Sequence, residues 1–301
     1  MSLIEQALGK MRANSQVAAA PAKAPEKPPV DTGATTARQR ALRMPPSRAV
    51  LDPDIRITDK MLEDLGLRAT PEQDFQRISE FRNVKRNLLG AIRAGVANRV
   101  ILVASALAGD GKSYCAANLA RSLALEPDFS VLLIDADVAK PHLTHALGLL
   151  EHKGLMNALV EPGCDVEELI LTTDIEGLSV LPAGSSHEHA TEHLSSERMR
   201  AVRELLEEMP NRIIVIDSLP ILQTTEAPVL APLVGQVLLV VRAETTPQSA
   251  VKRAVEILGP DVKVRLLLNG IVRTGASRYL GYDYGYAYRY GATIGQRPEL
   301  K

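Results

Sequence analysis

One stretch of this sequence constrains the fold more than any other: RVILVASALAGDGKSYCAANLA, residues 99–120. It begins as a continuous apolar run, passes through a turn that contains Gly109 and Gly111, and continues as a helix-forming segment that starts near Lys112. Where a buried strand runs through such a turn into a helix, the loop amides and the positive end of the helix dipole bind phosphate groups. The stretch therefore predicts a phosphate-binding turn at the end of a buried strand.

Five further apolar runs follow along the chain. They are VLLIDAD, LSVLPAG, RIIVIDS, QVLLVVRA and KVRLLLNG, and segments long enough to form helices separate most of them. Nearly continuous apolar runs are typical of parallel strands that helices cover on both faces. The sequence predicts an α/β fold over residues 75–272: a doubly wound, mostly parallel sheet of the P-loop NTPase type, with helices on both faces. Its first helix is expected from Phe75, with Phe75, Ile78 and Phe81 on the apolar side.

The rest of the chain divides by composition. We expect residues 1–16 to form a short amphipathic helix and residues 17–50, which are rich in Ala and Pro, to form a disordered linker. Residues 51–74 are expected to form a connecting segment. Residues 273–301 predict a flexible tail. It holds six of the seven tyrosines of the chain: Tyr279, Tyr282, Tyr284, Tyr286, Tyr288 and Tyr290.

Charge and hydropathy exclude several classes of protein. The net charge of −1 gives no bulk attraction to nucleic acid, so we expect no nucleic-acid partner. No apolar run approaches the roughly 20 residues that a membrane-spanning helix needs, and the first residues lack the apolar core of a signal peptide. We therefore expect a cytoplasmic protein.

Acidic residues end two of the predicted strands. Asp135 and Asp137 close VLLIDAD, and Asp217 closes RIIVIDS. Because the carboxyl ends of parallel strands meet at one edge of the sheet, these carboxylates are expected beside the phosphate-binding turn. There Lys112 would reach the β- and γ-phosphates, and Ser113 would hold Mg²⁺. The predicted nucleotide-binding residues of this turn are Ala108, Gly109, Asp110, Gly111, Lys112, Ser113 and Tyr114.

These motifs, in this order, resemble those of the bacterial tyrosine kinases (BY-kinases) that act with exopolysaccharide synthesis machinery. The residues that match the Walker A, Walker A′ and Walker B motifs of that family are Ala106–Ser113, Val131–Asp137 and Ile213–Asp217. The standard Walker A pattern has a glycine at the position of Ala106. The tyrosine-rich tail matches as well, and the opening MSLIEQALGKMR resembles the branch associated with exosortase (PEP-CTERM) loci.

The resemblance implies an ATP- and Mg²⁺-dependent protein-tyrosine autokinase that regulates exopolysaccharide synthesis and export. Its catalytic residues would be Lys112, Asp135, Asp137 and Asp217, and its metal ligands Ser113, Asp135 and Asp217. Asp137 would be the base for an incoming tyrosine hydroxyl, and Asn269, at the end of KVRLLLNG, would recognise adenine. The six tail tyrosines would be the phosphoacceptors, modified between subunits. Tyr114 is expected to pack rather than to accept phosphate.

The resemblance also implies partners. They are a membrane-anchored polysaccharide co-polymerase (a chain-length determinant protein), which would recruit the chain to the inner face of the membrane, a dephosphorylating tyrosine phosphatase, and further copies of the chain. Family members often form rings through a Glu-x-x-Arg-x-x-Arg helix, which is degenerate here and runs from Ser79 to Lys85. The candidate interface residues are Glu80, Arg82 and Lys85, and a solvated helix face is the alternative.

Two other functions stay open from the sequence. A ParA/MinD-like switch ATPase has the same three motifs, but its pattern has a lysine where this chain has Leu107. A nucleotide-binding scaffold of the polysaccharide machinery, without kinase activity, would also retain the motifs. Phosphotyrosine in the tail would distinguish the kinase from both.

Overall fold

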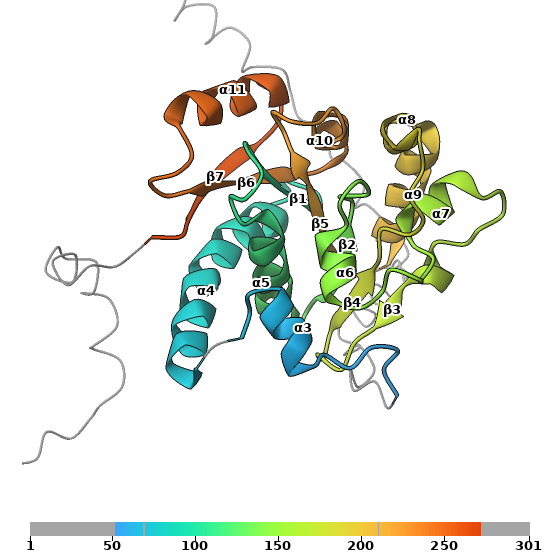
Figure 1. Cartoon of the computed structure of the whole chain (residues 1–301), viewed down its shortest axis with the longest axis horizontal. Coiled ribbons are helices and arrows are strands. Elements are labelled where there is room, and N and C mark those ends of the chain that lie inside the picture. Colours follow the sequence, from blue (N-terminus) through green and yellow to red (C-terminus); the bar gives the residue numbers. More distant parts are fainter. Residues whose placement is uncertain (1–51, 69, 210, 272–301) are drawn as a thin grey trace, which may run out of the picture. The chain divides into compact units, whose positions relative to one another are not determined.

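The computed structural model describes residues 52–271, except residues 69 and 210 (Figure 1). A seven-stranded sheet runs through this part of the chain in the order β3-β4-β2-β5-β1-β6-β7. The strands are β1 (Val100–Ser105), β2 (Ser130–Asp135), β3 (Leu171–Thr172), β4 (Leu178–Leu181), β5 (Arg212–Pro220), β6 (Gln236–Arg242) and β7 (Val264–Asn269). The predicted helix of residues 1–16, the linker of residues 17–50 and the tyrosine tail lie outside the described residues.

All neighbouring strands pair in parallel except β3 and β4. Every residue of β1 and β5 is buried. Such full burial is expected of parallel strands at the centre of a sheet that helices cover on both faces, and it explains why their sequences are continuously apolar.

Helices form a layer on each face of the sheet (Figure 1). One layer consists of α4 (Pro71–Arg93) and α5 (Lys112–Ala124), and the other includes α9 (Glu197–Glu208), α10 (Glu226–Leu230) and α11 (Gln248–Leu258). Shorter helices occupy the connections: α3 (Asp59–Asp64), α6 (His142–Ala146), α7 (Leu155–Val160), α8 (Ala190–Leu194), and the 3₁₀ turns Glu167–Leu169 and Ala231–Leu233. None of the helices in the described part of the chain is long and apolar enough to cross a membrane.

The segment that precedes α4 packs on the sheet domain. Ile55 forms a β-bridge with Thr173. The Asp54 carboxylate accepts hydrogen bonds from the backbone N–H (2.8 Å) and the hydroxyl (2.7 Å) of Thr172. After α3 the chain buries Leu65 in the same core as α4 and α5. Residues expected to form a connecting segment therefore contribute to the core, and the domain boundary at residue 75 stays a prediction.

The predicted fold class is confirmed, and each of the six apolar runs forms a strand. No apolar run predicts β3, because a pair of residues carries no periodic pattern. The start of α4 also differs from the prediction. The helix begins at Pro71, where the Thr70 hydroxyl accepts a hydrogen bond from the Gln73 N–H and the Gln73 side chain accepts one from the Thr70 N–H. This capping box fixes the helix start.

One side-chain expectation for α4 is wrong. Phe75 is 73% exposed, whereas Phe81 is buried as expected. Phe75 and Phe81 are six residues apart, and at 3.6 residues per turn their side chains point about 120° apart around the helix, so they cannot both face the core.

Candidate functional site

The phosphate-binding turn lies at the carboxyl end of β1, where α5 begins at Lys112. Gly109 and Gly111 have φ angles of 85° and 94°, in the left-handed region that favours glycine. A Cβ atom at Gly111 would also stand 2.2 Å from Nδ2 of Asn269. Both the backbone conformation and the available space therefore require glycine at position 111.

Side chains from distant parts of the sequence hold this turn. The Asp110 carboxylate accepts hydrogen bonds from the Leu107 N–H (3.2 Å) and the Thr246 hydroxyl (2.6 Å). Nδ2 of Asn269 donates to the Asp110 carbonyl at 2.9 Å. The Gln223 side chain accepts a hydrogen bond from the Ala108 N–H at 3.2 Å. The carboxylate of Asp110, a predicted nucleotide-binding residue, is thus engaged within the protein.

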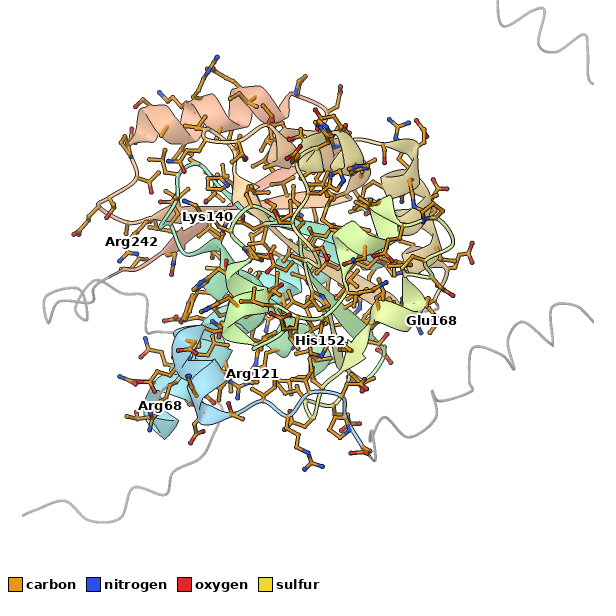
Figure 2. The ribbon with its side chains drawn as sticks, turned by 45° about the vertical axis from the view of Figure 1, so that its right-hand side comes forward. Arg68, Arg121, Lys140, His152, Glu168 and Arg242 are labelled. Atoms are coloured by element: carbon orange, nitrogen blue, oxygen red, sulfur yellow. The ribbon has the colours of Figure 1, made fainter. Side chains whose placement is uncertain are left out.

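Arg242, labelled in Figure 2, adds a further contact from the end of β6. Its guanidinium donates to the Gly109 carbonyl at 3.0 Å. The backbone carbonyls of Gly109 and Asp110 are therefore both turned towards donors at the ends of β6 and β7. A turn held in this way presents its shape before any phosphate binds.

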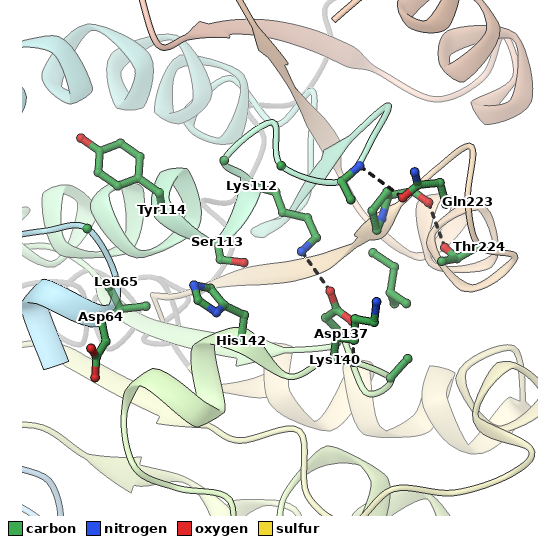
Figure 3. A pocket seen from close by; sticks show the side chains of 17 residues that line it. Asp64, Leu65, Lys112, Ser113, Tyr114, Asp137, Lys140, His142, Gln223 and Thr224 are labelled. Carbon is green, nitrogen blue, oxygen red and sulfur yellow. Dashed lines mark hydrogen bonds and ion pairs between the residues drawn. The ribbon is translucent and has the colours of Figure 1, made fainter. Parts of the chain in front are cut away.

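Lys112 and Asp137 form an ion pair, with Nζ 2.9 Å from Oδ2 (Figure 3). Both side chains are largely buried, at 14% and 8% exposure. The other Asp137 oxygen accepts a hydrogen bond from the Lys140 N–H at 3.0 Å. Burial alone would lower the pKa of Lys112, but the nearby carboxylates of Asp217, Asp137 and Asp135 outweigh it and raise that pKa. Lys112 is therefore a firmly charged ammonium group.

Asp135 is fully buried and accepts three hydrogen bonds. One oxygen accepts the Asp137 N–H at 3.1 Å, and the other accepts both the N–H and the hydroxyl of Thr144 at 2.8 Å. Burial raises the pKa of Asp135 against the opposite effect of the Thr144 hydrogen bonds. The Thr144 hydroxyl in turn accepts the Ala183 N–H at 3.0 Å. Thr144 thus joins β2 to the chain beyond β4 and fixes the Asp135 carboxylate.

Asp217 is fully buried on β5, directly beside Asp135 on β2. Neither of its carboxylate oxygens has a partner at normal hydrogen-bond geometry. Burial raises the pKa of Asp217, although the Lys112 charge and an interaction with the Ser113 side chain partly oppose this effect. Unpartnered oxygens in a buried carboxylate are costly unless a cation or donor joins them.

These residues fit a magnesium ion. Oxygen ligands are what Mg²⁺ prefers, and it usually takes one or two from carboxylates and the rest from water and substrate phosphates. Asp217 offers oxygens without a partner at normal hydrogen-bond geometry, and Ser113 is buried at the start of α5. Among the described residues no cluster of three or more His, Cys, Asp or Glu side chains has metal-binding spacing. The ion would therefore need the nucleotide phosphates to complete its shell.

A cavity of about 700 Å³ opens along the phosphate-binding turn (Figure 3). On one side of the turn its wall includes Asp64, Leu65, Tyr114 and His142, and on the other Gln223 and Thr224 (Figure 3). The Lys112–Asp137 pair lies between the two walls. Of the predicted catalytic residues, Lys112 and Asp137 line this cavity, as expected for a strand-end site, whereas Asp135 and Asp217 are fully buried and do not line it.

Two predicted residues near this site have structural contacts. The Tyr114 ring is half-buried, meets Phe81 edge-on at 6.5 Å between ring centroids and has the Arg77 guanidinium 5.7 Å from its centre. Tyr114 therefore packs as expected, while also lining the cavity. Asn269 lies at the end of β7 and holds the turn, which leaves its predicted contact with adenine untested.

Lys85 is a correction to the predicted oligomer interface. It is 8% exposed, and its ammonium lies 2.8 Å from both a Glu126 carboxylate oxygen and the Ser122 carbonyl. Lys85 lies on the side of α4 that faces α5. Its ammonium group pairs with Glu126 within the chain and is not available to a neighbouring subunit. Glu80 and Arg82 are exposed on α4. The six predicted phosphoacceptor tyrosines lie outside the described residues.

Several residues that shape the site carry no sequence motif. They are Thr144, Gln223, Arg242 and Thr246. Each is a common polar residue that gains its role from a contact across the fold, so no spacing in the sequence reveals it. Two local patterns mark only the turns on which Thr246 and Thr144 lie. They are the TP pair at residues 246–247 and the run DVAKPHLTH at residues 137–145.

Replacing Thr144 with valine is expected to lower the free energy of unfolding by about 1–3 kcal/mol. The change keeps the side-chain shape but removes one donor to Asp135 and the acceptor of the Ala183 N–H, and both partners are buried. Urea unfolding followed by circular dichroism measures the effect. Thr172→Val is the control, because its hydroxyl binds Asp54 in exposed surroundings and its loss should cost about 1 kcal/mol or less. Equal unfolding midpoints for Thr144→Val and the wild type would contradict the assigned role.

The sequence of this chain is similar to those of known proteins. Residues 98–256 match the AAA domain family. The chain is 32% identical over 183 residues to CapB of Staphylococcus aureus, covering 60% of this chain and 78% of CapB. It is 29% identical over 228 residues to the tyrosine-protein kinase YwqD of Bacillus subtilis, covering 75% of this chain and 89% of YwqD. It is 32% identical to ExoP, a succinoglycan biosynthesis transport protein of Rhizobium meliloti. The similarity covers 70% of this chain but only 27% of the length of ExoP.

Solved structures agree on the fold. The kinase domain of VpsO superposes with a TM-score of 0.57 at 29% identity, covering 68% of this chain and all of that domain. The kinase domain of Escherichia coli tyrosine kinase ETK superposes with a TM-score of 0.61 at 23% identity, covering 71% and 80% of the two chains.

Proposed function

Because this chain belongs to the bacterial tyrosine kinase family, with its AAA domain at residues 98–256, we propose that it is an ATP-dependent protein-tyrosine autokinase. The observation that carries the proposal is the 2.9 Å ion pair of Lys112 with Asp137. A phosphate-binding cation and a carboxylate suited to act as a base meet at one point of the cavity. A kinase needs both groups at the phosphate that is transferred.

The ion pair also suggests how nucleotide binding prepares the base. The phosphates of ATP are stronger partners for Lys112 than a single carboxylate, so binding is expected to draw its ammonium away from Asp137. Oδ2 of Asp137 then becomes free to accept the proton of a tyrosine hydroxyl. The Lys140 N–H continues to hold the other oxygen and keeps the carboxylate in place. In the absence of nucleotide the base is occupied by Lys112.

Ser113, Asp135 and Asp217 would hold Mg²⁺, which neutralises charge on the phosphates when bound. Asp217 offers oxygens without a partner at normal hydrogen-bond geometry for this role, and Thr144 holds the Asp135 carboxylate in place for it. The backbone of the turn from Ala108 to Ser113 would bind the phosphates. Asn269 would contact adenine beyond the turn, at the end of β7.

The substrates that we propose are the tyrosines of the tail: Tyr279, Tyr282, Tyr284, Tyr286, Tyr288 and Tyr290. Modification would occur between subunits of a homo-oligomer, in which Glu80 and Arg82 on the exposed face of α4 contact a neighbour. Each added phosphate brings about −1.5 to −2 charges. A tail with a balance of +3 would therefore become strongly negative and promote release of the subunits.

The proposed setting is exopolysaccharide synthesis and export, in the branch associated with exosortase loci. A membrane-anchored polysaccharide co-polymerase would recruit the chain to the inner face of the membrane, and a tyrosine phosphatase would reverse the modification. The relatedness to a succinoglycan biosynthesis transport protein supports this setting. Co-purification of the chain with its co-polymerase, before and after incubation with Mg·ATP, would measure whether phosphorylation changes the contact.

Incubation with Mg·ATP, followed by mapping of phosphotyrosine by mass spectrometry, tests the proposed function. We expect phosphotyrosine within residues 279–290 of the full chain and none in a chain that ends at Thr274. The shortened chain keeps all described residues and should still bind Mg·ATP. ATP hydrolysis by the full chain without phosphotyrosine would contradict the kinase proposal and favour a switch ATPase.

A further inference from the structure

The cavity extends along the phosphate-binding turn to the side on which Asp64, Leu65, Tyr114 and His142 lie (Figure 3). Asn269 and Arg242, which lie at the ends of β7 and β6, hold the turn from one flank and do not line the cavity. If adenine lies beside Asn269, the phosphates extend along the turn towards Lys112. The opposite flank, where Asp64, Leu65, Tyr114 and His142 line the cavity, is then left for a second substrate (Figure 3).

We propose that this flank, the acceptor wall formed by Asp64, Leu65, Tyr114 and His142, receives the tyrosine that is phosphorylated. The inference rests on the proposed kinase function and adds the residues that select its substrate. The preferred substrate is a basic peptide rich in tyrosine, such as residues 278–291 of a second copy of this chain.

The chemistry of the acceptor wall suits a tyrosine side chain. The Tyr114 ring is fixed by Phe81 and Arg77, so it presents a preformed aromatic surface to the cavity. The Tyr114 side chain points away from the Lys112–Asp137 pair (Figure 3), so an aromatic side chain of the peptide next to the reacting tyrosine can pack against it in an offset or edge-on arrangement. Asp64 and His142 are exposed at the rim, where they can contact the peptide on either side of the tyrosine. In Figure 3, His142 lies between Asp64 and the Lys112–Asp137 pair.

Charge favours the same occupant. The helix α3, which ends at Asp64, has the sequence DKMLED, with three acidic residues and one lysine. The peptide of residues 278–291 has two arginines, Arg278 and Arg289, and one acidic residue, Asp283. An acidic helix beside the entrance attracts this peptide and repels it once phosphate groups are attached. The same charges therefore promote binding of the substrate and release of the product.

The segment that carries the acceptor wall is anchored at both ends. Asp54 and Ile55 bind the β3 edge, and the Leu67 carbonyl accepts a hydrogen bond from the Arg77 guanidinium. Leu65 is buried between these anchors. Asp64 is therefore held at a fixed place beside the cavity, as a substrate-positioning residue must be.

In the reaction the phenol oxygen of the bound tyrosine forms a bond to the γ-phosphorus of ATP. The bond between that phosphorus and the β–γ bridging oxygen breaks, and ADP leaves with this oxygen. The phenol proton passes to the Asp137 carboxylate. Asp64 and His142 are positioning residues here, because they contact the peptide and not the reacting atoms.

Steady-state kinetics with a synthetic peptide of residues 278–291 tests the proposal, with Asp64→Lys and His142→Ala in a chain that ends at Thr274. Each variant is expected to raise KM for the peptide about 5- to 10-fold, because it removes or reverses a peptide contact. KM for ATP and kcat should stay within about twofold of the parent values. Glu63→Gln is the matched control, since its carboxylate pairs with Arg68 at 3.0 Å and does not line the cavity.

A charge swap sharpens the test. A peptide with Arg278→Glu and Arg289→Glu should bind the parent chain more weakly and the Asp64→Lys variant more tightly than the natural peptide does. An unchanged peptide KM in both variants, or an equal rise in KM for ATP, would overturn the acceptor wall. If the parent chain phosphorylates the peptide but the variants leave its KM unchanged, only the acceptor wall is overturned. If the parent chain does not phosphorylate the peptide at all, the kinase function is overturned as well.

Discussion

Replacing Lys112 with methionine is expected to lower the rate of tyrosine phosphorylation by about 10²- to 10³-fold, the usual cost of removing one preorganised group that stabilises transferring charge. Lys112 is the cation at the phosphate-binding turn, and its raised pKa keeps it charged at neutral pH. Without it the phosphates would face Asp217, Asp137 and Asp135 with no compensating side chain. The measurement is phosphotyrosine formed per minute at saturating Mg·ATP, together with nucleotide affinity.

Loss of folding must be separated from loss of chemistry in this experiment. Methionine leaves Asp137 buried without its ion-pair partner, which costs stability. Lys112→Arg keeps the positive charge and the ion pair but changes the shape of the cation. We expect its melting temperature to stay near that of the wild type while its activity falls. Lys252→Met, on the exposed side of α11, is the control for loss of a lysine. Normal phosphorylation by a folded Lys112→Met protein would contradict the role of Lys112.

The sequence predicts the centre of the sheet well because its central strands are buried on both faces. Full burial selects apolar residues at every position of β1 and β5, so these strands stand out from the segments between them. The start of α4 was accessible to the same reasoning, since Thr70 and Gln73 form a capping box. The exposure of Phe75 was accessible too, because residues six apart on a helix point about 120° apart and Phe81 faces the core.

The site is predictable only in part. Lys112, Asp135, Asp137 and Asp217 lie at strand ends in recognisable motifs, and the sheet brings them together. The contacts that hold them come from elsewhere: Thr246 is 136 residues from Asp110, whose carboxylate it binds. Such a pair leaves no local pattern in one sequence. The buried position of Lys85 is hidden for the same reason, because Glu126 lies on a different element.

Replacing Asp137 with asparagine is expected to lower the rate of phosphoryl transfer by about 10²- to 10⁴-fold, the range for removal of a general base. Nucleotide affinity should stay the same or rise. The asparagine oxygen can still accept the Lys140 N–H, so the loop should keep its conformation. Lys112, however, loses the carboxylate that competes with the phosphates for its ammonium. The rate of peptide phosphorylation and a titration with a fluorescent ATP analogue measure the two effects.

The contrast between the two variants is what identifies the roles within the ion pair. Lys112→Met should weaken both nucleotide binding and transfer, whereas Asp137→Asn should impair transfer alone, because only the lysine binds phosphate. Asp128→Asn, at an exposed carboxylate that lies 4.0 Å from Arg93, serves as the control for the loss of an acidic charge. The opposite result would be a lower nucleotide affinity of Asp137→Asn together with a normal rate of transfer from bound nucleotide. In that case Asp137 orders the turn, and another group accepts the proton. If both parameters stay normal, the ion pair is not part of the reaction.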